Sequence, residues 1–199
     1  MTIKTNTCIL ALKNGSNLWF AGDRRCSSGM EHYQKSPRPK INYRNNILLG
    51  AAGHAAMCDE LTDLYKIPHY EGGDIYQYIH NEFWPYFLAH LRSKELLKAD
   101  ELKATGKEVV LHGLVGLGDQ LFVCWVTDDD CGILNIDTPY AIGCGGQYAM
   151  GALRAIEILY TDSELEFDPK EMLNQALSIA AEYSAGCDDN IDILTNKEL

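Results

Sequence analysis

Apolar positions along the chain follow two different periods. Short runs rich in β-branched and aromatic residues alternate with longer stretches in which apolar residues recur every three or four positions, the spacing that predicts amphipathic helices. Asn14-Gly15 separates the first two runs and predicts a hairpin with a type I′ turn, which needs a positive φ at both central residues. The predicted strands span residues 7–13, 18–22, 46–53, 108–116, 120–127, 132–136 and 190–194.

Four helices are predicted between the strands. The first spans 54–66 and the second 75–91, and Pro85 is expected to kink or divide the second because proline removes one intrahelical hydrogen bond. The third runs over 147–160, and the fourth begins after Asp168-Pro169, an N-cap followed by proline at the first helical position. This order predicts an α+β protein, a four-layer αββα sandwich of two antiparallel sheets flanked by helices.

The composition favours one globular domain inside the cell. With 199 residues, 46% of them hydrophobic, the chain is long enough to bury about 70% of its unfolded surface, so we expect a single domain over 1–199. A net charge of −11 argues against a nucleic-acid partner, which requires clustered Lys and Arg. Seven cysteines without a Cys-x-x-Cys pair fit a reducing cytoplasm. The lack of a signal segment and of 18 consecutive apolar residues predicts a cytoplasmic protein without a membrane partner.

The first hairpin brings chemically useful residues together. Thr7 stands at the start of the first strand, and an antiparallel return of this length brings Asp23 into its neighbourhood. The run from Lys35 to Lys40, with prolines at 37 and 39, then leads into another apolar segment. A hydroxyl, a carboxylate and an ammonium are therefore expected to meet at one edge of the sheet.

Four segments, 7–13, 21–25, 27–29 and 40–41, carry a family resemblance. They read Thr-Cys-Ile-Leu-Ala-Leu-Lys, Ala-Gly-Asp-Arg-Arg, Ser-Ser-Gly and Lys-Ile, and they resemble the amino-terminal half of proteasome β-subunits and of the related HslV peptidase, as in a bacterial or phage-type proteasome homologue. In those N-terminal-nucleophile hydrolases the mature chain begins with the threonine. The resemblance implies catalytic roles for Thr7, Asp23, Lys40 and Gly50, the last through its backbone N–H, and substrate contacts for Arg25, Ser27 and Leu48.

The second half of the chain continues the resemblance with two departures. Residues 142–149 resemble the Gly-Ser-Gly-Gly turn before a helix in proteasome-type subunits, with Cys144 where serine stands. Cys144 is either a site residue near the threonine amine or a small buried residue in a tight turn. Residues 183–187 resemble the Asp-Ser-Ala-Ser-Gly stretch, with Tyr183 in place of the aspartate and Ser184 expected to keep part of the proton network.

The implied chemistry requires a free amine on the threonine. An α-amine has a pKa of about 7.7–8.0 and can act as the base for a threonine hydroxyl, provided that threonine is the first residue. Residues 1–6 are therefore a possible short propeptide, removed by cleavage of the Asn6–Thr7 bond. Thr2 is a poorer candidate because it lies about 16 Å upstream along an extended chain.

Other kinds of site have weaker support. The glycines at 143–146 lack the Gly-Lys-Ser/Thr of a phosphate loop, and Asp128-Asp129-Asp130 do not place ligands at the positions of a calcium loop. A Cys/His nucleophile has no local signature. We expect no cofactor and no metal.

The functional expectation is a threonine-type peptidase within a self-compartmentalising ring. The resemblance implies homo-oligomeric stacked rings, a possible ATPase unfoldase as partner, and peptides or unfolded proteins as substrates. The wide apolar face of 75–91 suggests a contact between subunits. The rival hypothesis is a catalytically silent ring or scaffold protein that keeps residues 1–6.

Overall fold

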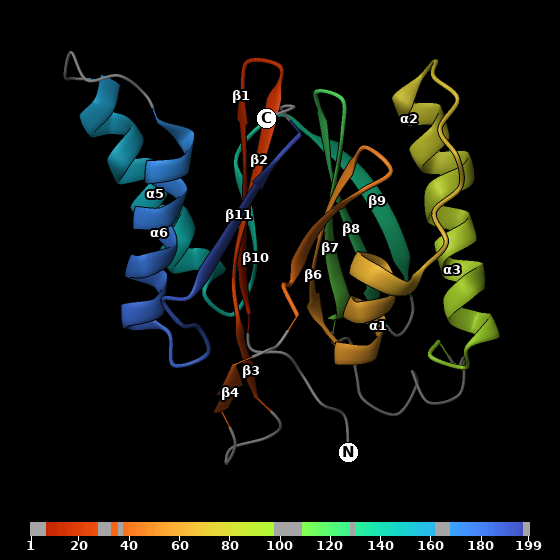
Figure 1. The fold of residues 1–199 in the computed structure, drawn as a ribbon, viewed down its shortest axis with the longest axis horizontal. Helices are drawn as coiled ribbons and strands as arrows, with labels where there is room; N and C mark the ends of the chain where they lie inside the picture. Colours follow the sequence, from red (N-terminus) through yellow and green to blue (C-terminus); the bar gives the residue numbers. More distant parts are fainter. Residues whose placement is uncertain are drawn as a thin grey trace.

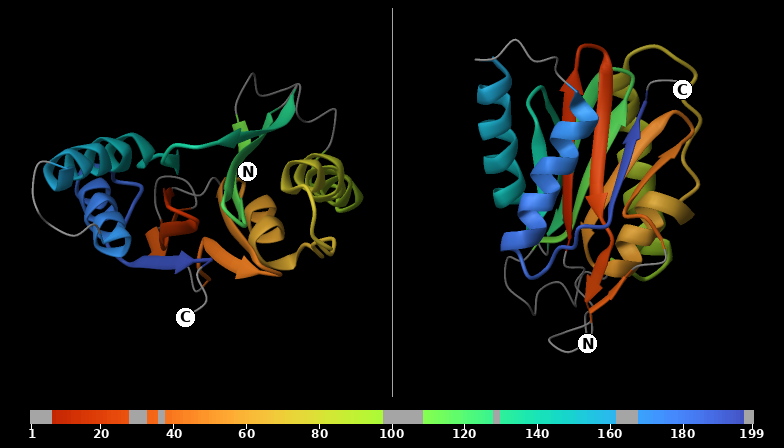
Figure 2. Two further views of the ribbon diagram at one scale, coloured as in Figure 1. Left: turned by 90° about the horizontal axis from the view of Figure 1, so that it is seen from above. Right: turned by 60° about the vertical axis from the view of Figure 1, so that its left-hand side comes forward.

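The protein is an αββα sandwich, as predicted (Figure 1). The computed structural model describes residues 7–27, 33–35, 38–97, 109–127, 130–161 and 168–196. Two antiparallel sheets face each other, with one pair of helices outside the first sheet and the remaining helical segments outside the second, an arrangement that Figure 2 shows from above and from the side. The segments outside the described residues include the possible propeptide of residues 1–6, the linker around 98–107, and the acids Asp128 and Asp129.

The first sheet carries the start of the chain at its centre. Its strand order is β10-β1-β2-β11, and every neighbouring pair is antiparallel. The strands are β1 (Cys8–Asn14), β2 (Asn17–Asp23), β10 (Tyr140–Gly143) and β11 (Ile191–Thr195). The pairs Cys8↔Gly143 and Asp23↔Ile191 fix one end of this sheet. Three distant parts of the sequence therefore meet where β1 begins.

The turn between β1 and β2 differs from the prediction. Asn14 pairs with Asn17, so the two central residues are Gly15 and Ser16, and of these two only Gly15 has a positive φ, 60°. Glycine at the first central position is typical of a type II′ turn. The hairpin is confirmed, but the type I′ assignment at Asn14-Gly15 is wrong by one residue.

The second sheet has the order β5-β6-β7-β8-β9. Its strands are β5 (Ile41–Arg44), β6 (Ile47–Gly53), β7 (Val109–Leu117), β8 (Gln120–Thr127) and β9 (Cys131–Ile136). Asn45 (φ 50°) and Asn46 (φ 64°) supply the two positive φ values of a type I′ pattern between β5 and β6. A small ribbon of β3 (Arg25–Ser27) and β4 (Tyr33–Lys35), which sequence analysis did not predict, projects from the end where β1 begins.

The interior between the sheets is apolar and closely packed. Glycines at 22 and 50 leave room for large side chains opposite them, since a Cβ at either position would approach Ile9 or Ile41 to 3.1 Å. The cluster between the sheets consists of Ile9, Ala11, Leu18, Phe20, Ile41, Leu48, Ala52, Leu114, Leu121, Val123 and Ile142. It fixes the separation of the sheets and hence of the strand ends that carry the polar residues.

The helical segments outside the second sheet are interrupted by π-helical turns. They comprise α1 (Ala55–Asp59), η1 (Glu60–Leu64), α2 (Ile75–Tyr78), η2 (Ile79–Phe83) and α3 (Trp84–Ser93). Pro85 lies in the first turn of α3, which follows η2 directly. The backbone stays helical at both junctions, so the segment continues as one helix with a π-helical turn and is not divided at Pro85.

The apolar face of this layer is buried within the domain. Phe83, Phe87 and Leu91 are fully buried against the second sheet, whereas Tyr76 and Tyr86 are exposed. The second sheet covers these buried residues, and the subunit contact expected for part of this segment stays a prediction.

The helices outside the first sheet are α5 (Gly146–Thr161) and α6 (Pro169–Tyr183). The side chain of Asp168 accepts the backbone N–H of Lys170, as expected for an N-cap. Several large apolar side chains on these two helices are exposed: Tyr148, Ile158, Leu159, Ile179 and Tyr183. Within the described residues, no helix has the length and apolar character needed to span a membrane.

Candidate active site

Thr7 lies at the head of β1 and is wholly buried. Its carbonyl oxygen accepts a hydrogen bond from the backbone N–H of Gly145 at 3.4 Å and from the Cys144 thiol at 3.6 Å. Gly143 has a φ of 91°, and a Cβ there would collide with the Thr7 carbonyl. A glycine is required at 143 because the β10–α5 turn approaches the Thr7 backbone so closely.

The Thr7 hydroxyl is the most unusual group at this end of the sheet. Its Oγ1 is buried and has no hydrogen-bond partner among the residues that the structure describes. Buried hydroxyls normally have a partner, because an unsatisfied one costs about 1–3 kcal/mol. An unpaired buried hydroxyl is therefore a candidate for chemistry rather than for structural support.

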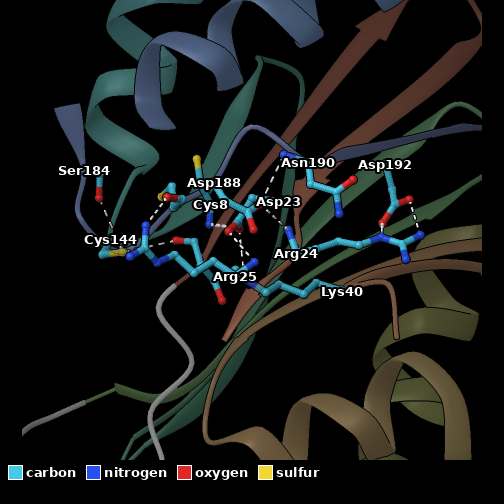
Figure 3. A network of polar contacts seen from close by, with 12 residues as sticks. Cys8, Asp23, Arg24, Arg25, Lys40, Cys144, Ser184, Asp188, Asn190 and Asp192 are labelled. Atoms are coloured by element: carbon cyan, nitrogen blue, oxygen red, sulfur yellow. Dashed lines mark hydrogen bonds and ion pairs between the residues drawn. The ribbon is translucent and has the colours of Figure 1, made fainter. Parts of the chain in front are cut away.

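Asp23, the last residue of β2, is 1% exposed and accepts three hydrogen bonds. Oδ1 accepts the backbone N–H of Cys8 at 2.7 Å and the Lys40 ammonium at 2.9 Å, and Oδ2 accepts the N–H of Arg25 at 3.0 Å (Figure 3). Burial raises the pKa of Asp23, while Lys40 and the two backbone donors oppose that rise. The carboxylate thereby ties the residue after Thr7 to a buried cation.

Lys40 is the expected partner of Asp23. Its side chain is 7% exposed, and its backbone carbonyl accepts the N–H of Ala51 at 3.3 Å, so it continues the pairing of β5 with β6. This burial excludes an exposed surface position for Lys40 after the prolines at 37 and 39. Lys40 and Asp23 form the ion pair predicted from the hairpin.

A second set of polar side chains contacts the other side of Thr7. The Cys144 thiol, which reaches the Thr7 carbonyl, accepts a hydrogen bond from Ser184 Oγ at 3.7 Å. The contact with Cys187 and burial raise the pKa of the Cys144 thiol, which is therefore protonated near neutral pH. The structure thus brings Cys144 and Ser184 together with Thr7, as predicted.

Tyr183 does not contribute to this set. It is 64% exposed and stacks on Tyr148, with ring centroids 6.3 Å apart. The helix α6 ends here, and Ser184 follows as its C-cap, with its N–H bonded to the Ala180 carbonyl. The chain thus turns Ser184 inwards and leaves Tyr183 in solvent.

Two arginines connect the end of β2 to the segment after α6 through hydrogen bonds. Arg24 forms two side-chain hydrogen bonds of 2.6 Å with Asp192, and its backbone N–H donates to Asp188 at 3.1 Å. Arg25 donates through Nη1 to the Cys187 carbonyl at 3.0 Å. Sequence analysis missed these links, although the opposite charges at 24 and 192 were a usable signal once the β2–β11 pairing was known. Arg25 therefore has a structural role at the position where a substrate contact was expected.

Three of the expected site residues require correction or further definition. Leu48 is fully buried between the sheets, so the predicted substrate contact is wrong. The N–H of Ala51 points towards β5, and alternate residues of a strand point to opposite neighbours, so the N–H of Gly50 points towards β7. The geometry therefore does not support an oxyanion role for Gly50. Ser27 ends β3, and its side chain lies outside the described part of the structure.

Comparison with known proteins extends these observations. The ATP-dependent protease subunit HslV of Sulfurovum sp. (strain NBC37-1) is 26% identical over 193 residues, 94% of this chain and 97% of that protein. The HslV of Helicobacter pylori (strain P12) is 28% identical over 155 residues, 76% of this chain and 74% of that protein. A search with models of protein families finds no match.

Solved structures share the fold. The BPH protein of Thiobacillus denitrificans, in complex with epoxomicin, superimposes with a TM-score of 0.73 at 16% identity, over 95% of this chain and 97% of that one. The eukaryotic HslV of Trypanosoma brucei gives 0.58 at 18% identity, over 95% and 98%. The fold thus places the chain in the class of αββα sandwiches that contains HslV. Together with the sequence matches, it shows that the chain is HslV-like, that is, similar to proteins of the proteasome β-subunit type.

Proposed function

We propose that the chain is a threonine-type peptidase that uses Thr7 as its nucleophile. The observation that carries this proposal is the buried Lys40–Asp23 ion pair, whose carboxylate also holds the backbone N–H of Cys8, next to Thr7. Groups whose pKa is shifted by burial and by a specific charge partner are concentrated at functional sites, and Asp23 is such a group. The relatives named above are themselves ATP-dependent protease subunits, which supports the same reaction class.

The reaction requires Thr7 to be the first residue of the mature chain. Cleavage of the Asn6–Thr7 bond frees an α-amine, which accepts the proton of the Thr7 hydroxyl while Oγ1 attacks the scissile carbonyl carbon of a peptide. The protonated amine then gives its proton to the leaving amine, and an ester links the substrate to Thr7. Attack by water, with the amine again as base, releases the second product and restores the hydroxyl.

Lys40 and Asp23 supply the electrostatic environment of this reaction. A positive charge favours the deprotonated form of a neighbouring hydroxyl, and the buried Lys40 side chain is paired with the Asp23 carboxylate at 2.9 Å. The two contacts on the Thr7 carbonyl hold the backbone in place, so that the amine and the hydroxyl keep a fixed relation.

A Thr7→Ala variant tests the nucleophile. We expect it to lose cleavage of small fluorogenic peptides, whereas Thr7→Ser retains part of it and Thr5→Ala, a matched change two residues upstream, retains all of it. Because BPH binds epoxomicin, we also expect epoxomicin to inhibit the wild-type chain. Undiminished cleavage by Thr7→Ala would reject the assignment.

We further propose that copies of the chain assemble into stacked rings that receive unfolded protein from an ATPase. The similarity to ATP-dependent subunits supports this assembly, and so do the exposed apolar side chains of α5 and α6, such as Leu159 and Tyr183. Light scattering at micromolar concentration checks it, and a mass near the 22.2 kDa of one chain would contradict it.

A further inference from the structure

Asp188 links the segment after α6 to the residue that follows Asp23. Its Oδ1 accepts the backbone N–H of Arg24 at 3.1 Å and the backbone N–H of Asn190 at 3.3 Å (Figure 3). Asn190 lies two residues further along the same segment, whereas Arg24 lies 164 residues away in the sequence. The chemistry proposed for Thr7 assigns no role to this carboxylate.

Arg24 controls one hydrogen bond of the buried ion pair. It is the single residue between β2 and β3, and Asp23 Oδ2 accepts the N–H of Arg25, on the other side of it, at 3.0 Å. The carboxylate and this donor are therefore connected through the Arg24 backbone, whose dihedral angles decide whether the two groups meet. A change in the Arg24 backbone would loosen the Asp23 carboxylate, which also holds Lys40 and the N–H of Cys8.

The Arg24 backbone lies beyond the end of a strand pair. The pairing of β2 with β11 ends at Asp23↔Ile191, so the acceptor of the Arg24 N–H is the Asp188 carboxylate rather than a strand carbonyl. The Arg24 guanidinium binds Asp192 through two bonds of 2.6 Å, but it does so at the end of a long side chain with several rotatable bonds. That ion pair connects β2 with β11 and constrains the Arg24 backbone less directly than Asp188 does.

A cavity of about 520 Å³ borders Asp188 on the side of α6. Its lining includes Glu182 of α6 and the exposed Asp189, which is next in the chain. Because side chains do not fill this space, packing alone does not determine where the Asp188 carboxylate lies. Its position depends on its hydrogen bonds to the two backbone donors.

We propose that Asp188 is a positioning residue for the Thr7 site, because its carboxylate holds the Arg24 backbone and thereby keeps the Arg25 N–H on Asp23. The role requires an oxygen that accepts the N–H of Arg24. A neutral amide oxygen meets this requirement as a carboxylate does, so the role needs the acceptor and not the charge.

Loss of this hold has a defined effect on Asp23. Burial raises the pKa of Asp23, and the N–H of Arg25 is one of the donors that oppose the rise. A donor to the carboxylate favours its charged form, so removal of this donor raises the pKa of Asp23 further. The pH at which Asp23 takes up a proton therefore reports whether Asp188 holds the Arg24 backbone.

Hydrogen exchange followed by mass spectrometry tests the hold independently of activity. In Asp188→Ala, peptides that contain residues 24 and 25 should exchange at least about tenfold faster than in the wild-type chain, because the Arg24 N–H loses its acceptor. Asp188→Asn removes the same charge but keeps an oxygen acceptor, so it should retain the protection. Asp189→Ala, an equal change of charge at the exposed neighbour, should match the wild type. Unchanged exchange in Asp188→Ala would overturn the proposal.

The effect on the reaction rests on the proposed peptidase function and needs a second measurement. A misplacement of about 1 Å costs about a hundredfold in rate, and a smaller shift of Asp23 in Asp188→Ala should lower kcat about tenfold while KM changes less than about twofold. The Asp23-dependent limb of the pH–rate profile should move to higher pH in this variant and stay in place in Asp188→Asn, which should keep at least about a third of kcat.

A destabilised neighbour separates positioning from stability. Arg24→Ala breaks the ion pair with Asp192 but keeps the backbone N–H, so it should lower the unfolding midpoint in urea and leave the limb in place. An unshifted limb in Asp188→Ala, or an Asp188→Asn variant as impaired as Asp188→Ala, would overturn the positioning role. Lack of peptide cleavage by the wild-type chain would instead reject the peptidase, and the exchange measurement would still decide whether Asp188 holds residues 24 and 25.

Discussion

The two sides of Thr7 are built from different kinds of interaction. On one side, Asp23 collects three donors at 2.7–3.0 Å, one of them the buried ammonium of Lys40. On the other side, Cys144 joins Thr7 and Ser184 through contacts of 3.6 and 3.7 Å to a sulfur that is a weak donor and acceptor. The ionic side is held by short, charge-assisted bonds, and the thiol side by weak ones.

This difference separates two tasks. The ionic side places a buried ion pair on the backbone N–H of Cys8, next to Thr7, and removal of one partner leaves a buried charge without a counter-charge. The thiol side only positions a backbone carbonyl, which Gly145 also holds. Changes on the ionic side should therefore have much larger effects on catalysis than changes among the thiol-side polar groups.

The largest effect is expected for Lys40→Met. We expect it to reduce kcat/KM for a small peptide by at least about a hundredfold, the scale of losing one electrostatic stabiliser. It should also lower the free energy of unfolding by about 3–5 kcal/mol, since the buried Asp23 loses its counter-charge. Steady-state kinetics and urea titration measure the two effects.

Two further variants define what Lys40→Met removes. The double change Asp23→Asn with Lys40→Met should recover part of the lost stability, because no uncompensated charge remains, without recovering activity. Lys13→Ala, which breaks a partly exposed pair with Asp119 at 3.6 Å, should change stability by about 0–1 kcal/mol. If Lys40→Met were as mild as Lys13→Ala, the ionic side would have no special role.

A smaller loss is expected for Gly143→Ala. The new Cβ would meet the Thr7 carbonyl at a positive φ, so either the turn or Thr7 must shift, with a loss in kcat/KM of about ten- to a hundredfold. Gly151→Ala is the matched control, because a Cβ on that exposed face of α5 meets nothing within 4 Å and should stabilise the helix slightly. Equal activities in the two variants would contradict the close approach to Thr7.

Below the acid limb that protonation of the Thr7 α-amine sets, a second acid limb of the pH–rate profile should report Asp23. Burial raises the pKa of Asp23, so the carboxylate takes up a proton at a higher pH than the ordinary value of 3.8. As the pH falls through this raised pKa, Lys40 loses its counter-charge and activity declines. The midpoint of this limb should therefore lie above pH 3.8. The limb should be absent from the pH profile of any activity that Asp23→Asn retains. An unchanged limb in that variant would assign it to another group.

The smallest effect is expected for Ser184→Ala. Its hydroxyl donates to the Cys144 sulfur, a neutral contact of 3.7 Å, so kcat/KM should fall by less than about threefold and stability by less than about 1 kcal/mol. A hundredfold loss would mean that the thiol side contributes as much as the ionic side, and the comparison would fail.

Local pattern was sufficient to predict the layers and the ionic side of the site. The period of the apolar residues separated strands from helices, and the first hairpin set Asp23 beside the head of β1, where Lys40 joins it. The ribbon of β3 and β4 was missed because each strand has three residues and carries no readable alternation.

What the sequence did not reveal depends on register and on long-range contact. The pairing of β6 with β5 and β7 decides which neighbouring strand the N–H of Gly50 faces. It also decides on which face of β6 the side chain of Leu48 lies. The contacts of Cys144 with Thr7 and Ser184 join three segments that are brought together only by the sheet order and the end of α6. The spacing of residues along the chain indicates neither the strand register nor these contacts between distant segments.

The central claim is that Thr7 acts as an amino-terminal nucleophile, and the intact mass of the purified chain tests it most directly. The account predicts that the wild-type protein has lost residues 1–6 and begins at Thr7, whereas Thr7→Ala retains them. A wild-type chain that cleaves peptides with residues 1–6 still attached would contradict it.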